Sequence, residues 1–321
     1  MMKTTLRTAL LTLLLCVTSV VSAQNASSWA QLEGQLTFYI ANDLGRNGYY
    51  DQRPVAELMG QMAETVEPEC VFAAGDVHHF DGVASTADPL WMTNFETIYA
   101  HPELMIAWHP ILGNHEYRGS TQAVLDYSHI SRRWQMPARY YTRSFTKKST
   151  SIRFILLDTT PLITRYREDS DTYPDAVAQD KDRQLAWLDS TLNAAREQWV
   201  VVVGHHPMYA VTGKDDSERT DLQKSLDPIL RRHHVDMYVA GHIHNFQHHR
   251  AKGSDTDYVV NSSASLARPI DSKPSATPND GLRFADGTEG FSVVTADSKQ
   301  LRLSFIDKKG NIIYTITRTK K

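Results

Sequence analysis

The sequence predicts an α/β fold in which two packed mixed β-sheets are flanked by α-helices. Short apolar runs rich in β-branched and aromatic residues alternate with helical patterns along most of the chain. Turns that contain glycine and polar residues follow five of these runs, and the carboxyl-terminal part alternates like antiparallel strands. The 321 residues suffice for one large domain, which we expect to cover residues 36–321.

The expected elements follow from these patterns in chain order. Five buried strands are expected at 36–41, 70–74, 106–112, 200–203 and 237–240. The clearest helical periodicities lie at 54–65, 124–133, 180–195 and 222–233. Alternating runs at 290–296, 300–306 and 312–317, with a hairpin turn at 309–311, are expected to complete the second sheet. The polar segment 164–182 and the Ser-, Ala- and Pro-rich segment 263–278 are expected to be irregular.

Five polar blocks follow the five expected strands. They are Asp43-Leu-Gly45, Gly75-Asp76-Val-His-His79, Gly113-Asn114-His115-Glu116, Gly204-His205-His206-Pro207 and Gly241-His242-Ile-His244. Ligands collect at the carboxyl ends of strands in open α/β sheets, so these blocks are expected to meet in one cleft. A single Asp after a strand is more often a turn or helix cap, and the prediction therefore rests on all five blocks together.

The side chains in these blocks are suited to metal ions. Carboxylate oxygens, an amide oxygen and imidazole nitrogens come from Asp43, Asp76, Asn114, His205, His242 and His244. This mixture favours Fe, Mn or Zn over Ca or an isolated Mg. The number of ligands exceeds what one ion needs, and two ions about 3.5–4 Å apart that share a carboxylate would use them all. Asp76 is our candidate for the shared ligand.

The blocks resemble those of the calcineurin-like metallophosphoesterase superfamily, and within it the small purple, or tartrate-resistant, acid phosphatases. The likeness covers residues from about 36 to 318 and includes framework segments outside the blocks. These are Tyr127-Ser-x-Ile-Ser-x-Arg-Trp134 with Pro137 and Tyr141, Leu157-Asp158-Thr159, Gln184-Leu-x-Trp-Leu188, Gly241-His-x-His-Asn-x-Gln247, Leu282-Arg-Phe284 and Gly287-Thr-Glu289. The resemblance implies the four-layer sandwich of this superfamily.

The resemblance also implies a role for each site residue. Asp43, Asp76 and His244 would bind the first metal, and Asp76, Asn114, His205 and His242 the second. His115 would contact the substrate and protonate or stabilise the leaving-group oxygen, a task that suits imidazole near neutral or mildly acid pH. In the resembled family, the segment that corresponds to 164–182 is a loop near the mouth of the active site. It could gate access here, although an ordinary surface loop is the simpler expectation.

One position departs from the resembled pattern. Three residues after Asp76 the purple enzymes have a tyrosine, whose phenolate binds ferric iron and causes the colour, whereas this chain has His79. We expect His79 to be a ligand of the first metal, with a solvent-facing side chain as the alternative. Imidazole is a neutral ligand and favours divalent ions, so no ferric-tyrosinate centre is expected.

These features predict a metal-dependent phosphatase of the acid phosphatase type that hydrolyses phosphate monoesters by attack of a metal-bound hydroxide. A phosphodiesterase or nucleotide hydrolase on the same metal site is the first alternative. A phosphate-binding relative without catalytic activity is the second. No Gly-x-Ser-x-Gly motif of a serine hydrolase occurs in the sequence.

The amino terminus predicts export to the periplasm or the extracellular space. Lys3 and Arg7 precede an apolar run at 9–21, and small residues before Gln24 offer a cleavage site, so residues 1–23 are expected to be a signal peptide. Residues 24–35 would then form an amino-terminal extension. Cys16 raises the alternative of a lipoprotein, but the bulky Leu15 before it argues against that processing. The apolar run is too short for a membrane span.

Charge excludes some classes of partner. The net charge of −3 argues against general binding to nucleic acid or to anionic membranes, and a small phosphorylated substrate is the expected partner. A monomer is favoured. The basic pairs at 132–133 and 231–232 are expected on solvated helix faces, and His248 and His249 at the surface, with the cleft mouth as the alternative place for these histidines.

Overall fold

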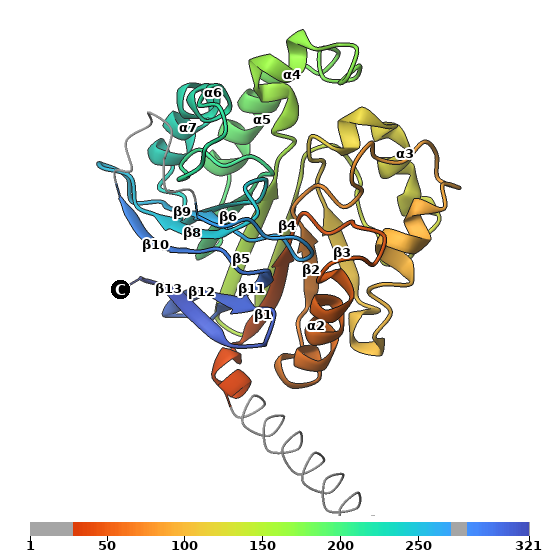
Figure 1. Ribbon diagram of the computed structural model, residues 1–321. Coiled ribbons are helices and arrows are strands. Elements are labelled where there is room, and N and C mark those ends of the chain that lie inside the picture. The colour runs from red at the N-terminus through yellow and green to blue at the C-terminus, as the bar shows by residue number, and fades with distance from the viewer. Residues whose placement is uncertain (1–27, 271–280, 321) are drawn as a thin grey trace, which may run out of the picture.

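The computed structural model describes residues 28–270 and 281–320 (Figure 1). The predicted signal peptide and part of the 263–278 segment lie outside these residues. Of the amino-terminal extension, residues 28–35 are described and pack onto the domain. Trp29 and Leu32 are buried, and Trp29 Nε1 donates a hydrogen bond of 2.8 Å to Gly310 O.

Across the described residues the strands form two mixed sheets. The six-stranded sheet has the order β13-β12-β11-β1-β2-β3 and the seven-stranded sheet the order β10-β8-β9-β7-β6-β5-β4. The first contains β1 (Leu36–Ala41), β2 (Cys70–Ala73), β3 (Ala107–Pro110), β11 (Gly290–Ala296), β12 (Gln300–Asp307) and β13 (Ile312–Thr319). The second contains β4 (Tyr141–Lys147), β5 (Thr150–Leu156), β6 (Trp199–Val203), β7 (Met237–Ala240), β8 (Phe246–His249), β9 (Asp257–Val260) and β10 (Leu282–Asp286).

Helices flank these sheets (Figure 1). They are α2 (Gln52–Val66), α3 (Thr121–Asp126), α4 (Thr164–Glu168), α5 (Lys181–Asn193), α6 (Ser217–Ser225) and α7 (Asp227–Arg232). Short single-turn helices lie at Ala30–Leu32, Met92–Glu96, Pro102–Leu104, Glu116–Arg118, Tyr127–His129 and Thr160–Leu162. In Figure 1, α2 lies beside β1 and β2, whereas α5, α6 and α7 lie with the seven-stranded sheet. The predicted fold class is therefore confirmed.

An aromatic cluster joins the two sheets. The ring of Phe154 on β5 lies 4.0 Å from that of Phe72 on β2 and 4.8 Å from that of Phe38 on β1. Phe145 on β4 lies 4.8 Å from Phe38. Burying these aromatic faces against one another provides a large apolar contact that holds the sheets together.

The parallel strands of each sheet determine where the site forms. β1 pairs in parallel with β2 and β2 with β3, and in the other sheet β5, β6, β7 and β9 are parallel in that order. All five predicted buried strands exist, and their carboxyl ends carry the polar blocks. The carboxyl-terminal strands join the sheet that contains β1, because β11 pairs antiparallel with β1. The sequence analysis expected these strands to complete the second sheet, but they lie in the same sheet as β1.

Two predicted helices are wrong in extent. The predicted helix 124–133 overlaps only the end of α3, which finishes at Asp126. The chain then turns back, and Trp134 Nε1 donates a hydrogen bond to Val124 O. Arg133 is consequently buried, and its guanidinium donates to Tyr99 O and pairs with Glu96, so it does not lie on a solvated helix face. The expected helix 222–233 is two helices that meet near Leu226, because Pro228 begins a new helical turn.

His248 and His249 are not at the surface. Both lie buried on β8, a strand that the sequence analysis did not identify. His248 Nε2 lies 2.9 Å from Asp257 Oδ1 and His249 Nε2 lies 2.8 Å from Gln247 Oε1. β8 has the sequence Phe-Gln-His-His, and three consecutive polar residues with buried partners do not produce the apolar run from which a buried strand is recognised.

Candidate metal centre

The side chains of the five polar blocks meet at the carboxyl ends of the strands, between the two sheets. Asp43 follows β1, Asp76 and His79 follow β2, and Asn114 follows β3. His205 follows β6, and His242 and His244 follow β7. Every one of these predicted ligands is buried, whereas His115 is partly exposed. The structure thus brings together the residues that the sequence analysis selected.

The backbone of this site is held in an unusual conformation. Asp43, Asp76, His242 and His244 have φ values of 51°, 52°, 70° and 65°, in the left-handed region that L-residues seldom adopt. Neighbouring glycines allow the close packing this needs. A Cβ atom on Gly75 would lie 2.5 Å from His205 Nδ1, and one on Gly113 would overlap the Asp76 carboxylate. Such backbone outliers cluster at functional sites, because the surrounding structure must impose them.

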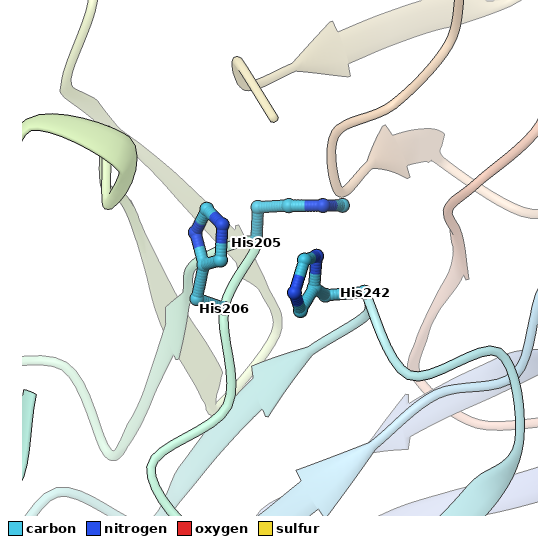
Figure 2. A group of neighbouring side chains, drawn as sticks. All are labelled: His205, His206 and His242. Carbon is cyan, nitrogen blue, oxygen red and sulfur yellow. The ribbon is translucent and has the colours of Figure 1, made fainter. Parts of the chain in front are cut away.

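Three histidines form one group of the site (Figure 2). His205 and His206 come from the segment after β6, and His242 faces them from the segment after β7. His205 Nδ1 donates to Ala74 O at 2.9 Å, which turns Nε2 towards Asp76 Oδ2, 3.0 Å away. His242 Nε2 lies 2.9 Å from both Glu218 Oε2 and Lys214 Nζ, so Nδ1 is the nitrogen available to a metal.

His206 belongs to this group in space but has partners for both ring nitrogens. Nδ1 lies 2.9 Å from Thr159 Oγ1, and Nε2 lies 3.2 Å from Tyr166 OH. Tyr166 OH in turn donates to Glu218 Oε1 at 2.8 Å. His206 therefore ties α4 to the site and is not a candidate ligand.

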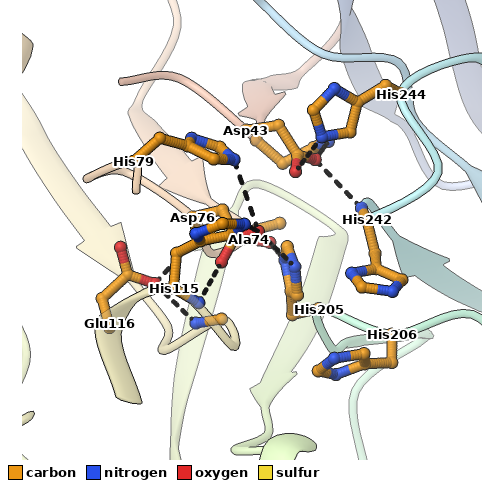
Figure 3. Close-up of polar contacts among 12 residues, drawn as sticks. Asp43, Ala74, Asp76, His79, His115, Glu116, His205, His206, His242 and His244 are labelled. Atoms are coloured by element: carbon orange, nitrogen blue, oxygen red, sulfur yellow. Dashed lines mark hydrogen bonds and ion pairs between the residues drawn. The ribbon is translucent and has the colours of Figure 1, made fainter. Parts of the chain in front are cut away.

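A second group contains Asp43, His79 and His244 (Figure 3). Asp43 Oδ1 lies 2.9 Å from His244 Nε2, and Asp43 Oδ2 accepts a hydrogen bond of 2.9 Å from the His242 backbone N–H. His79 Nδ1 donates to Gly45 O at 3.2 Å, and its side chain is buried. The alternative in which His79 faces solvent is wrong.

Asp76 lies between the two groups. Its Oδ2 atom is 3.0 Å from His205 Nε2, 3.7 Å from His79 Nε2 and 3.9 Å from His115 Nε2. Its Oδ1 atom accepts a hydrogen bond of 2.9 Å from the His115 backbone N–H. This central position is the one that a carboxylate shared by two ions needs.

Charge and burial prepare these groups for a cation. Burial opposes ionisation of Asp43, but His244 outweighs it and holds the pKa of that carboxyl well below its usual range. Burial lowers the pKa of His79 well below its usual value and that of His242 to about 4, so both imidazoles are neutral. Burial alone would lower the pKa of His205, but Asp76 raises it to about 9.

Several buried atoms fit a metal better than any protein partner. Asp43 Oδ1, His79 Nε2, Asn114 Oδ1 and His205 Nε2 have no hydrogen bond of suitable geometry to any described residue. Buried polar atoms are nearly always hydrogen-bonded, so four such atoms in one place are exceptional. Their mixture of oxygen and imidazole nitrogen fits Fe, Mn or Zn. The residues present therefore fit the predicted metal ions.

His115 is oriented towards the cleft by its own hydrogen bond. Its Nδ1 atom donates to Phe80 O at 2.6 Å, which directs Nε2 towards the Asp76 side of the site. His115 also lines a cleft of about 500 Å³ together with Asp76, Asn114, His242 and His244. Tyr166 and Tyr173, from the segment expected to lie near the mouth, line the same cleft and are both buried.

The sequence analysis missed several residues that support the site. Glu116 accepts hydrogen bonds from the backbone N–H groups of Asp76, His78 and Gly113, although it stands within one of the quoted blocks. Glu218 and Lys214 contact His242 from a segment without a recognisable motif. Only the three-dimensional arrangement identifies them.

Comparisons with known proteins agree with this site. Residues 36–246 match the calcineurin-like phosphoesterase family, and the chain belongs to that family. Purple acid phosphatase 17 of Arabidopsis thaliana is 29% identical over 335 residues, which cover 98% of this chain and 95% of the relative. Tartrate-resistant acid phosphatase type 5 of Sus scrofa is 30% identical over 275 residues, which cover 81% of this chain and 78% of the relative.

Among solved structures, the GAP50 structure, described as the anchor in the inner membrane complex of Plasmodium, superposes with a TM-score of 0.74. Its sequence identity is 21%, and the match covers 89% of each chain. This likeness shows the fold. The family and its acid phosphatase members together support a metal-dependent phosphatase that acts on small phosphorylated substrates, and the predicted resemblance is confirmed. No described helix is long and apolar enough to cross a membrane.

Proposed function

We propose that this chain is an exported phosphomonoesterase with a two-metal centre. The observation that carries the proposal is the set of buried ligand atoms around Asp76 that lack a hydrogen bond of suitable geometry to any described residue. Asp43, Asp76, His79 and His244 would hold the first ion. Asp76, Asn114, His205 and His242 would hold the second, so Asp76 would serve both. When bound, the ions supply Lewis acidity, which polarises the phosphate ester and activates water.

The chain's own residues complete the chemistry. Hydrolysis forms a bond from phosphorus to a water oxygen and breaks the bond to the leaving oxygen, which needs a proton. His115 delivers that proton from Nε2, because its Nδ1–H is held by Phe80 O and the ring faces the cleft. His115 also lies near enough to Asp76 to stay within reach of the scissile bond.

Cations in the cleft favour monoesters over diesters. Arg46, Arg118, Lys214 and Arg268 line it and form no ion pair within 4.0 Å with any described carboxylate. A monoester carries about two negative charges near neutral pH and a diester one, so this lining stabilises the monoester more. Export by cleavage of residues 1–23, a single domain over 36–321 and a preference for acid pH belong to the same proposal.

The test combines metal content with substrate choice. Purified mature protein is analysed for Fe, Mn and Zn, and its turnover of p-nitrophenyl phosphate is compared with that of bis(p-nitrophenyl) phosphate. Two ions per chain and preference for the monoester are expected. Preference for the diester would establish the phosphodiesterase alternative, and failure of both after reconstitution with each metal would indicate a binding protein. Amino-terminal sequencing that begins at Gln24 would support export.

A further inference from the structure

Arg46 is a buried guanidinium without a counter-charge in hydrogen-bond contact. The residue is 7% exposed, and its Nε and Nη1 atoms have no hydrogen-bond partner among the described residues. The guanidinium carbon of Arg46 lies 4.8 Å from the centroid of the Phe80 ring. Burial of an unpaired charge is costly, and buried polar atoms without partners commonly meet a ligand.

A second arginine without a carboxylate partner among the described residues lines the same cleft. Arg268 lines the same cleft, and its backbone N–H donates to His244 O at 2.7 Å, which places the residue next to the metal ligands. Burial lowers the pKa of Arg46, Asp43 and Asp76 oppose that shift, and the positive charge of Arg268 adds to it. Both arginines line this one cleft, and no described carboxylate lies within 4.0 Å of either guanidinium group.

Another arginine of the cleft shows the contrast. Arg165 also lines it, but its Nη1 atom pairs with Glu218 Oε1 at 3.0 Å. The guanidinium group of arginine offers a planar set of hydrogen-bond donors that matches the oxygens of a phosphate. A scissile phosphate that metal ions already bind does not need two further guanidinium groups, so a second phosphate is the better partner for them.

We propose that Arg46 and Arg268 form a subsite for a second phosphate group, so that the preferred substrates are monoesters that carry a further phosphate beyond the one hydrolysed. This rests on the proposed function. The scissile phosphate lies on the Asp76 side of the cleft, and the second phosphate accepts hydrogen bonds from the unpaired Nε and Nη1 donors of Arg46. The Phe80 ring, 4.8 Å from the guanidinium carbon, adds a cation–π contact to Arg46.

The experiment compares a monophosphate with two substrates that carry a second phosphate, and comparing the substrate ratio between variants cancels the different reactivity of ester and anhydride bonds. For the metal-loaded protein, kcat/KM is measured on adenosine 5′-monophosphate, adenosine 5′-diphosphate and adenosine 3′,5′-bisphosphate, in the natural chain and in R46Q, R268Q and R165Q. We expect R46Q to lower the ratio of a two-phosphate substrate to the monophosphate by about tenfold to a hundredfold, the usual effect of lost charge-assisted hydrogen bonds. R268Q lowers it less, because Arg268 is exposed, and R165Q leaves the ratio within about twofold.

The two probes distinguish an adjacent from a remote second phosphate. Selective loss on the diphosphate assigns the subsite to a neighbouring phosphate, and selective loss on the bisphosphate to a distant one. Calorimetric titration of metal-loaded protein with inorganic phosphate and with pyrophosphate gives a readout without turnover, in which R46Q weakens pyrophosphate more. Metal analysis of each variant excludes loss of the ions.

Equal losses on all three substrates would overturn the subsite, because Arg46 would then serve the scissile phosphate or the metal ligands. An unchanged ratio in R46Q would overturn it as well. Absence of any turnover by the natural chain on the monophosphate would instead refute the proposed phosphatase function, so the two failures are distinguishable.

Discussion

Replacing Glu116 with Gln should destabilise the protein by about 3 kcal/mol, because this buried carboxylate organises the segment that carries Asp76. Its Oε2 atom accepts hydrogen bonds from Asp76 N at 2.9 Å and Gly113 N at 2.7 Å, and its Oε1 atom accepts one from His78 N at 3.0 Å. In E116Q the side-chain oxygen can still accept hydrogen bonds from the backbone N–H groups of Asp76 and Gly113. The NH₂ group then faces the His78 N–H, so one charge-assisted hydrogen bond is lost and two buried donors point at each other.

The free energy of unfolding is measured by urea titration in the presence of a chelator, so that metal binding does not contribute. The matched control is E64Q, because the Glu64 side chain is 63% exposed and its Oε1 atom lies 3.3 Å from His101 Nε2. E64Q should change the free energy of unfolding by less than about 0.5 kcal/mol. A loss below about 1 kcal/mol for E116Q would refute the reasoning, since it would mean that the three backbone donors find water or another acceptor.

Further predictions concern the site and its surroundings. Chelation should lower the melting temperature, and Fe, Mn or Zn should restore it, since a ligand at about 1,000 times its Kd adds about 4 kcal/mol; an unchanged melting curve would argue against a bound metal. H79A should reduce metal content by about one ion per chain, and an unchanged stoichiometry would remove His79 from the ligand set. H115A should lower kcat by about 10²–10⁴-fold with metal content unchanged, and a loss under about tenfold would refute its acid role. Burial raises the pKa of the Asp158 carboxyl from 3.8 to about 7, so the protonated carboxyl stabilises the fold at acid pH and this stabilisation is lost as pH rises towards 7. The melting temperature of D158N, which cannot ionise, should therefore rise relative to that of the natural chain between pH 5 and pH 8. A constant difference between the two melting temperatures would contradict this.

The parts of the fold that the sequence predicted are those with a local signal. The runs before Asp43, Asp76 and His205 are almost wholly apolar, because parallel strands covered on both faces bury every side chain, and such runs stand out in a sequence. The predicted ligands can also be recognised locally, because each is a polar residue that lies near a glycine directly after such an apolar run.

The parts that the sequence did not predict depend on contacts between distant residues. Glu218 reaches His242 from α6, and Lys214 does so from the preceding segment, so neither has a sequence neighbour that marks it. Arg133 looked like part of a solvated face, yet Glu96 and Tyr99 supply its partners from a segment more than thirty residues earlier. Such contacts between residues far apart in the chain neutralise a buried charge. They produce no periodic pattern in the sequence, so the sequence alone does not predict them.

The strained conformation of Asp43 shows why the site needs the carboxyl-terminal part of the chain, beyond the 36–246 family match. Two serines hold its backbone, because Ser263 Oγ and Ser265 Oγ both donate to Asp43 O, at 2.9 and 2.7 Å. Its side chain accepts a hydrogen bond of 2.5 Å from Asn42 Nδ2, and Asn261 Nδ2 donates to Asn42 Oδ1 at 2.6 Å. A φ of 51° in an L-residue costs of order 1–3 kcal/mol, which this fully buried network must offset. The network therefore holds the carboxylate that we propose as a metal ligand, which β1 alone could not hold in this conformation. The candidate metal centre thus depends on residues from the whole domain.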